Sequence, residues 1–230
     1  MIGEPGRAGH NVLCCARHHA CEAMGSYVLE GALAFFLSAE AAELRRSTAV
    51  TIVPMVDLDG VEAGDQGKGR APHDHNRDYI DAPLYPEVRA VQQLMAELAG
   101  RNLAAYLDFH APWIRGGANE SVFFAEPPEP FAGRLHEFAA ALKAVNRGAI
   151  PYTGRFDIPH GTSWNVPTEG LVNSTDYAER VSARTLLFSA TLETSYSIAE
   201  AVAVTPEGAR GLGQAVGRAL AAYLTPGAGR

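Results

Sequence analysis

The stretch NVLCCARHHACEAMGSYVLEGALAFFL, residues 11–37, decides the fold class of this chain. It opens with a short apolar run at residues 11–16, which is typical of a buried strand. Residues 21–37 then carry apolar side chains at helical spacing, among them Met24, Val28 and Phe36. A strand that leads into an amphipathic helix is the repeating unit of an α/β protein, so we expect the same alternation further along the chain.

The rest of the sequence continues this alternation. Further strands are predicted at residues 48–56, 103–109, 122–124 and 185–192, and further helices at residues 87–99, 131–145 and 206–223. Thr205 is placed to cap the last helix. Residues 62–86 form a long polar loop, and residues 150–175 are irregular. This order predicts a mainly parallel sheet flanked by helices, in a single domain at residues 11–230 after a flexible N-terminal segment at residues 1–10.

Composition and charge exclude several classes of function. The formal net charge is -7, and no basic run interrupts it, so binding to nucleic acid is not expected. No apolar stretch is long enough to span a membrane, and residues 1–10 do not resemble a signal peptide. The three cysteines, Cys14, Cys15 and Cys21, do not make a disulfide framework and favour a reducing compartment. We therefore expect a cytoplasmic protein; an exported form stays open if the N-terminus is incomplete.

The polar turn after the first strand contains a candidate metal site. His19 and Glu22 are three residues apart, so both side chains can face one side of a helical turn. His110 closes a predicted strand far downstream, and together the three residues supply the ligands of an open zinc site. A His–Glu pair at a helix start can also be an ordinary ion pair, since a carboxylate is favoured there. His18 neighbours His19, but only His19 has the H-x-x-E spacing.

Other side chains that can take part in catalysis also follow predicted strands. The polar loop comes after the strand at residues 48–56, and Glu193 closes the strand at residues 185–192. Ligands of α/β sheets bind beyond the carboxyl ends of the strands. The sequence therefore predicts that these segments converge on one active site.

The order of motifs resembles that of the zinc metallocarboxypeptidases. The motifs are H-x-x-E at residues 19–22, DGV at 59–61, DHNR at 74–77, a strand that ends in His110, and TLET at 191–194. The resemblance covers residues 12–196, and the loop lengths are those of a bacterial member nearer the cytosolic-type branch than the digestive enzymes. It implies a three-layer α/β/α sandwich with a mixed, mainly parallel sheet.

The resemblance also implies a metal and its ligands. His19, Glu22 and His110 would hold one Zn²⁺ per chain, and Asp74 would accept a hydrogen bond from the far nitrogen of His19. Sites of two histidines and a glutamate also take cobalt or manganese.

The substrate-binding and catalytic residues are carried over in the same way. Asn76 and Arg77 would bind the terminal carboxylate of a peptide, and Tyr177 is the candidate for a tyrosine that the family places near the substrate. Glu193 would act as general base on a zinc-activated water, and then as acid to the leaving amine.

The family also uses an arginine to stabilise the oxyanion, and this chain departs from that pattern. The segment QGKGR, residues 66–70, offers two cations in shifted register. Lys68 and Arg70 are both candidates for the role.

The sequence leaves three functions open. The first is a carboxypeptidase that acts on a peptide, and the second is a zinc-dependent deacylase of small N-acyl amino acids, similar to aspartoacylase and succinylglutamate desuccinylase. The third is a peptide-binding relative without catalysis, although all three ligands and Glu193 are retained. The expected partner is a peptide or small amide with a free carboxylate. The family that this chain resembles usually has further strands before the first ligand, and their absence would leave a sheet edge exposed, which favours a homo-oligomer or a fragment of a longer protein.

Overall fold

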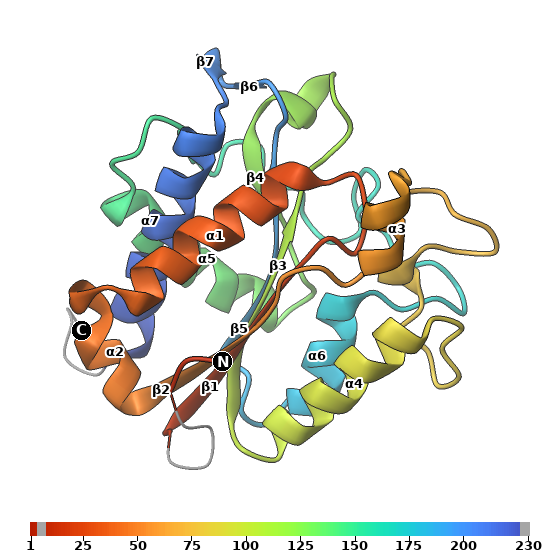
Figure 1. Ribbon diagram of the computed structural model, residues 1–230, viewed down its shortest axis with the longest axis horizontal. Helices are drawn as coiled ribbons and strands as arrows, with labels where there is room; N and C mark the ends of the chain where they lie inside the picture. Colours follow the sequence, from red (N-terminus) through yellow and green to blue (C-terminus); the bar gives the residue numbers. More distant parts are fainter. Residues whose placement is uncertain (4–7, 226–230) are drawn as a thin grey trace.

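The computed structural model describes residues 1–3 and 8–225 (Figure 1). Five strands form the main sheet: β1 (His10–Ala16), β2 (Thr48–Val53), β3 (Leu103–His110), β4 (Val122–Ala125) and β5 (Phe188–Thr194). The α-helices are α1 (Ala23–Leu37), α2 (Ala42–Ser47), α3 (Leu58–Ala63), α4 (Pro86–Ala99), α5 (Phe131–Val145), α6 (Ser174–Ser182) and α7 (Pro206–Leu224). A small hairpin, β6 (Ile198–Ala199) and β7 (Val202–Ala203), precedes α7. Short 3-10 helices lie at Ala39–Ala41, His75–Arg77 and Gly117–Glu120.

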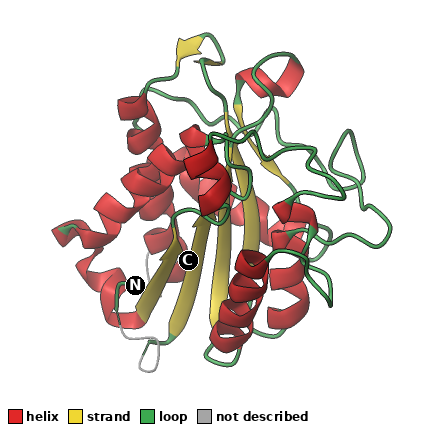
Figure 2. Cartoon of the chain, turned by 45° about the vertical axis from the view of Figure 1, so that its right-hand side comes forward, coloured by secondary structure: helices red, strands yellow, loops and turns green. Residues whose placement is uncertain are grey.

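The main sheet is mixed and mostly parallel, as the sequence predicts. Its strand order is β2-β1-β3-β5-β4, with the first four strands parallel and β4 antiparallel to β5 (Figure 2). Because the four parallel strands end at one edge, the segments that follow them gather there.

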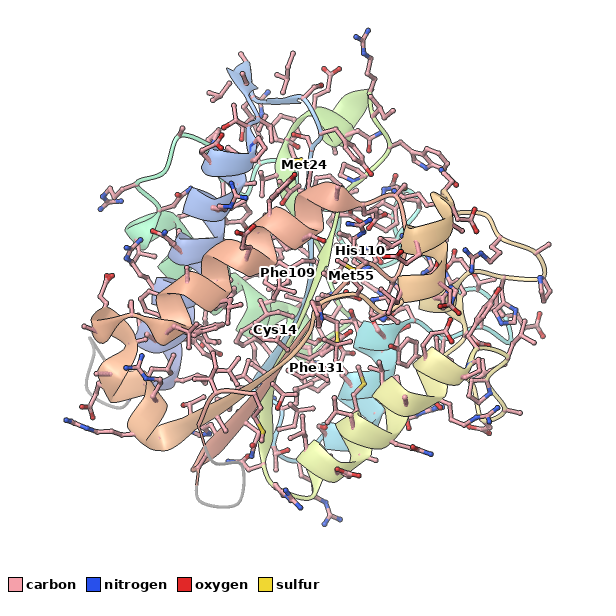
Figure 3. All side chains as sticks on the ribbon, in the orientation of Figure 1. Cys14, Met24, Met55, Phe109, His110 and Phe131 are labelled. Carbon is pink, nitrogen blue, oxygen red and sulfur yellow. The ribbon has the colours of Figure 1, made fainter. Side chains whose placement is uncertain are left out.

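Helices cover both faces of this sheet and create two apolar cores. Helices α1, α5 and α7 pack together on one face, and α4 and α6 pack on the other (Figure 1). Successive residues of β1 alternate between the cores, with Cys14 in the first and Cys15 in the second. Phe109 belongs to the first core and Phe131 to the second (Figure 3). A strand that is buried on both faces reads as a continuous apolar run, which explains the opening motif.

Three local predictions differ from the structure. The sequence DLDG at residues 57–60 is typical of a turn, but Asp57 accepts a hydrogen bond from Gly60 N at 2.9 Å and caps α3. The predicted strand at residues 48–56 ends at Val53. Helix α6 was not predicted, because its sequence STDYAERVS contains few apolar residues and its first residues fall in the stretch read as irregular. The cap at Thr205 is confirmed, since its Oγ1 accepts from Gly208 N at 3.1 Å.

The predicted N-terminal segment lies partly outside the described residues. Residues 4–7 are not described, whereas Ile2 and Val50 exchange two backbone hydrogen bonds of 2.8 Å at the outer edge of β2. This pairing satisfies part of the edge that the sequence left open. In the described ranges, no helix combines the length and apolar character that crossing a membrane requires.

Helix α6 carries a buried acidic group, Glu179, and this has a consequence for stability. The side chain is 7% exposed and accepts a hydrogen bond from Ser189 Oγ of β5. Burial raises the pKa of Glu179 from 4.5 to about 8, with a further contribution from the charge of Asp176. The folded state therefore keeps a proton that the unfolded state releases. The stability that this group contributes is present below about pH 4.5 and is lost as the pH rises through about 8.

We expect Glu179→Gln to be more stable than the wild type at pH 9, and close to it at pH 4. The gain at high pH should be a few kcal/mol, since one unit of pKa difference corresponds to about 1.4 kcal/mol. Urea unfolding of the metal-free wild type and variant at both pH values measures this difference in the free energy of unfolding. Glu97→Gln on the exposed face of α4 is the control and should leave the free energy of unfolding unchanged at both pH 4 and pH 9. An equal change at both pH values would contradict the raised pKa.

Candidate active site

The carboxyl ends of β1, β3 and β5 meet at the candidate site. The register pairs His110 of β3 with Glu193 of β5, and Phe109 with Ala16 at the end of β1. The chain then turns through His19, and Glu22 N donates to His19 O at 3.1 Å before α1 begins at Ala23. The H-x-x-E pair therefore lies on the turn that leads into α1, rather than inside the predicted helix at residues 21–37.

His19, Glu22 and His110 bring three potential ligand groups together. The Glu22 carboxylate lies between the imidazoles, with Oε1 at 2.7 Å from His19 Nδ1 and Oε2 at 2.8 Å from His110 Nδ1. Burial opposes ionisation of Glu22, but the two imidazoles outweigh it and hold the pKa of Glu22 well below its usual range. Two nitrogens and an ionised carboxylate within 4.8 Å of one another are suited to a zinc ion.

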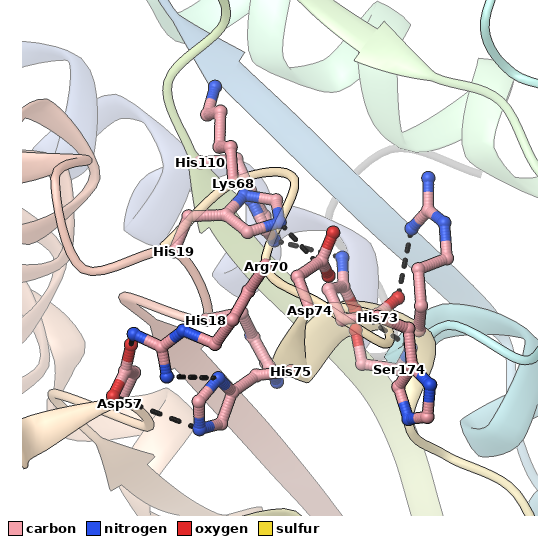
Figure 4. A network of polar contacts seen from close by, with 12 residues as sticks. His18, His19, Asp57, Lys68, Arg70, His73, Asp74, His75, His110 and Ser174 are labelled. Atoms are coloured by element: carbon pink, nitrogen blue, oxygen red, sulfur yellow. Dashed lines mark hydrogen bonds and ion pairs between the residues drawn. The ribbon is translucent and has the colours of Figure 1, made fainter. Parts of the chain in front are cut away.

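The far nitrogens of both histidines face carboxylates, which strengthens the case for a metal. Asp74 Oδ1 lies 3.3 Å from His19 Nε2, a close approach without hydrogen-bond geometry (Figure 4). Asp108 Oδ2 lies 2.9 Å from His110 Nε2. Histidines that bind zinc usually make such contacts, which orient the ring and raise its basicity. The residues present therefore fit zinc.

A second possible ligand group lies behind the first. The Asp108 carboxylate joins His18 Nδ1 to His110 Nε2, both at 2.9 Å, and also accepts a hydrogen bond from Ser174 Oγ at 2.6 Å. His18 Nε2 and the Tyr79 hydroxyl are 2.7 Å apart. His18 and Asp108 are fully buried, so this group is closed to a substrate. His19, by contrast, lines both cavities described below.

Glu193 is a buried carboxylate that faces the site. Its side chain is 7% exposed, and its Oε2 has no hydrogen-bond partner among the described residues. Burial and the charge of Glu22 raise the pKa of Glu193 to about 7. A carboxylate with a pKa in this range can both accept and return a proton near neutral pH.

The structure separates the two candidate cations of the 66–70 segment. Lys68 Nζ lies 2.7 Å from Glu22 Oε1 and donates to Ala111 O at 2.6 Å, so its charge is at the site. Arg70 points away, because its guanidinium binds Asp57 Oδ2 at 2.9 Å and also pairs with Asp65.

Gly67 lets the Lys68 loop approach the ligand turn closely. Its φ is +82°, and a Cβ at this position would lie 2.5 Å from Ala20 N. The adjacent Gln66 O accepts from Cys21 N at 3.2 Å, which ties the loop to the turn. The backbone therefore places Lys68 beside Glu22.

Of the predicted substrate-binding residues, two line the site and one does not. Asn76 Oδ1 accepts from Ser174 N at 3.0 Å, and its Nδ2 lies 3.3 Å from His110 Nε2. Arg77 donates to Asn76 O at 2.9 Å with one nitrogen and lines both cavities. Tyr177 is not among the lining residues; its ring centroid lies 5.7 Å from that of Tyr79, and the half-buried side chain packs against the second core.

Two cavities open on either side of these residues, and both are lined by His19, Arg77, Trp164 and Glu193. The inner cavity runs between β4, β5 and the start of α6, and includes Ala125, Glu126, Thr175, Asp176 and Thr191. The outer cavity includes Glu22, Lys68, Asp74, Pro112, Trp113 and Asn119. The two cavities therefore share one wall.

Sequence reasoning missed several residues of this site. A role for Asp108 beside His110 could have been assigned from the sequence, because residues two apart in a strand share a face and His110 was already a candidate. Ser174 and Asp176 had no such signal, since they belong to the helix that was not predicted.

Comparisons with known proteins agree with this fold. A sequence model of the zinc carboxypeptidase family matches residues 2–82, which include His19, Glu22 and the DHNR motif. Cytosolic carboxypeptidase 2 of Danio rerio is 32% identical over 109 residues, and cytosolic carboxypeptidase 4 of Homo sapiens is 33% identical over 101 residues. These matches cover 45% and 41% of this chain, but only 15% and 9% of the relatives.

Solved structures share the architecture over nearly the whole chain. A metallo-carboxypeptidase from Burkholderia cenocepacia has a TM-score of 0.73 at 21% identity, and the match covers 96% of this chain and 59% of that one. The metallo-carboxypeptidase from Pseudomonas aeruginosa in complex with (2-guanidinoethylmercapto)succinic acid has a TM-score of 0.70 at 21% identity, covering 93% and 57%. The sheet and its helices are thus those of a three-layer carboxypeptidase-like fold. The family model over residues 2–82 and the shared fold make this chain similar to the zinc carboxypeptidases.

Proposed function

We propose that this chain is a zinc-dependent metallocarboxypeptidase that hydrolyses the C-terminal amide bond of a peptide. One observation carries the proposal. The ligand group His19–Glu22–His110 lies at a cavity wall together with a cation and a buried, unpartnered carboxylate, Glu193. Hydrolysis of an amide requires these groups within reach of one carbonyl.

His19, Glu22 and His110 hold the zinc in this proposal, and Asp74 and Asp108 orient the two imidazoles. When bound, zinc supplies a Lewis acid that polarises a carbonyl and lowers the pKa of water to about 7. The carboxylates behind the histidines keep each Nδ1 directed at the site, which supports this assignment.

Arg77 and Asn76 bind the terminal carboxylate of the substrate. Arg77 uses one nitrogen for Asn76 O and keeps further N–H groups for a carboxylate. Asn76 Oδ1 accepts from Ser174 N, and its Nδ2, which lies 3.3 Å from His110 Nε2, has a second N–H for the substrate. These contacts position the last residue of the peptide with its amide bond toward Glu193.

Glu193 moves the proton. Its unpartnered oxygen takes a proton from the attacking water and then returns it to the leaving amine. Lys68 stabilises the negative charge that develops on the carbonyl oxygen, a role that its contact with Glu22 supports and that the ion pairs of Arg70 disfavour.

The two cations therefore respond differently to replacement. We expect Lys68→Met to lower kcat by about 10²–10³-fold, the effect of removing one oxyanion donor. Arg70→Met should leave kcat within a few-fold of the wild type, but lower stability by about 2 kcal/mol because the buried Asp57 carboxylate loses its partner. Steady-state kinetics and urea unfolding of both variants test this. The reverse pattern would assign the oxyanion role to Arg70.

The cytosolic-type branch is the nearer relative in this proposal. Two curated proteins that match, from Danio rerio and Homo sapiens, are cytosolic carboxypeptidases, at 32% and 33% identity. The proposal for peptides with a free terminal carboxylate is also supported by the Pseudomonas aeruginosa neighbour, whose bound compound is a succinic acid.

Metal content and turnover test the function together. The purified protein is expected to contain about one zinc per chain. It should release the C-terminal amino acid from blocked dipeptides, lose this activity with a chelator and regain it with zinc. N-acyl amino acids are the parallel substrates. Release of acetate or succinate without dipeptide cleavage would replace the carboxypeptidase with a deacylase, and no zinc uptake would overturn both.

A further inference from the structure

The first turn of α6 supports the site from behind through a residue that the proposed hydrolysis does not use. Ser174 is the first residue of α6, and it is fully buried. Its neighbours Asn173 and Thr175 line the inner cavity, but Ser174 is not among the described residues that line either cavity. Any effect of Ser174 on a bound metal or substrate therefore passes through other side chains.

The hydroxyl of Ser174 binds the carboxylate that lies behind His110. Ser174 Oγ donates to Asp108 Oδ2 at 2.6 Å, and the same oxygen lies 2.9 Å from His110 Nε2. The other oxygen, Asp108 Oδ1, lies 2.9 Å from Nδ1 of the buried His18. Because breaking a hydrogen bond to a buried carboxylate costs free energy, these contacts on both oxygens fix the orientation of Asp108.

The orientation of Asp108 determines which nitrogen of His110 faces the candidate metal site. With Nε2 donating its proton to Asp108, Nδ1 keeps a lone pair and lies 2.8 Å from Glu22 Oε2, inside the ligand group. A carboxylate at the far nitrogen sets the tautomer and the ring orientation of a histidine ligand. A group that holds this carboxylate therefore also holds the ligand.

The backbone around Ser174 is fixed by contacts that do not involve its hydroxyl. Ser174 N donates to Asn76 Oδ1 at 3.0 Å, beside the DHNR segment (Figure 4). The hydroxyls of Thr175 and Thr191 lie 2.9 Å apart, which connects the same turn of α6 to β5. These contacts give the Ser174 hydroxyl a defined position, and they remain when the hydroxyl is removed.

We infer that Ser174 is a positioning residue for the metal ligand His110, and that it acts through Asp108. This inference rests on the ligand set of the proposed function, but not on the hydrolysis of a peptide. One residue of α6 thus serves the two halves of the site by different atoms: its hydroxyl supports the metal ligand, and its backbone N–H supports the substrate-binding Asn76.

Zinc affinity measures the contribution of the hydroxyl. Ser174→Ala is expected to weaken zinc binding by about tenfold, the lower end of the effect of losing an outer contact of a metal site. Competition with a chromophoric chelator gives the affinity without turnover. Ser182→Ala is the matched control, because Ser182 is buried in the same helix and its Oγ has no hydrogen-bond partner among the described residues. This control should bind zinc as the wild type does.

A double-mutant cycle tests the route through Asp108. Asp108→Ala removes the carboxylate and should weaken zinc binding by about 10–100-fold. If Ser174 acts only through this carboxylate, Ser174→Ala in the Asp108→Ala protein causes no additional loss. A further tenfold loss in the double variant would mean that Ser174 acts by another route, and would overturn the inference.

Kinetics at saturating zinc separate positioning of the metal ligand from a general disturbance of α6. Ser174→Ala retains the N–H that binds Asn76, so the KM for a blocked dipeptide should stay within a few-fold of the wild type. Weaker zinc binding together with a KM raised tenfold would indicate that the whole turn has moved, which contradicts the inference.

The outcomes distinguish this inference from the proposed function. A cooperatively folded Ser174→Ala protein with wild-type zinc affinity, or an equal loss in Ser182→Ala, overturns the inference and leaves the carboxypeptidase intact. Weaker zinc binding in Ser174→Ala alone supports it, even if no dipeptide is cleaved and the carboxypeptidase proposal fails. A wild-type protein that takes up no zinc overturns both.

Discussion

Glu193→Gln is expected to lower kcat for dipeptide hydrolysis by about 10³-fold, the contribution of a general base. The amide has nearly the shape of the carboxylate but cannot take a proton from water. Glu193 is not a member of the ligand group, so zinc content and affinity should stay close to those of the wild type. Stopped or continuous assays of amino acid release give kcat, and metal analysis of the same sample gives its zinc content.

The control for this change is an exposed carboxylate on the same side of the molecule. Glu120→Gln, next to the cavity residue Asn119, alters the net charge equally and should leave kcat unchanged. Unfolding of Glu193→Gln must also remain cooperative, since the residue is buried. A folded, zinc-loaded Glu193→Gln protein with wild-type activity would show that another group acts as base.

His19→Ala is expected to abolish stoichiometric zinc binding, and Asp74→Asn to weaken zinc affinity by about 10–100-fold. The first change removes one of three ligands. The second leaves the ligands but removes the charge behind His19, and the expected size is that of such outer contacts. Competition with a chromophoric chelator measures both affinities on purified protein.

Zinc binding by His19→Ala also distinguishes the two possible ligand groups. His136→Ala, an exposed histidine whose ring pairs with Glu126, is the control and should bind zinc as the wild type does. If His19→Ala retained one tightly bound zinc, the metal would belong to the buried group of His18, Asp108 and His110. Loss of zinc in His19→Ala with retention in His136→Ala places it between His19, Glu22 and His110.

Much of the fold follows from local sequence, because apolar periodicity reports which side of an element is buried. The predicted helix at residues 131–145 matches α5, and the run at residues 11–16 lies in β1 with both faces covered. Helix α6 was not predicted, because few of its residues are apolar. Its nine residues include Asp176, Glu179 and Arg180, and the helix is stabilised by packing on the sheet rather than by an apolar stripe.

For the site, spacing along the chain was informative only over short distances. The interval between His19 and Glu22 restricts both to one turn, and the structure brings their side chains within 2.7 Å. The roles of the ligands and of Glu193 stay predictions for the experiments above. The partner of His110 at Asp108 Oδ2 could have been read from strand alternation, but the hydrogen bond from Ser174 could not.

The sequence by itself determined the alternation of strands and helices, the ligand spacing and the order of the motifs, since each depends on neighbours along the chain. Only the tertiary structure shows which of Lys68 and Arg70 lies beside Glu22, because Asp57 binds the Arg70 guanidinium while Gly67 brings Lys68 against the ligand turn. It also places Tyr177 against the second core and Asp176 in the cavity wall. Such outcomes arise from contacts between distant segments, and these form only when the sheet and α6 assemble.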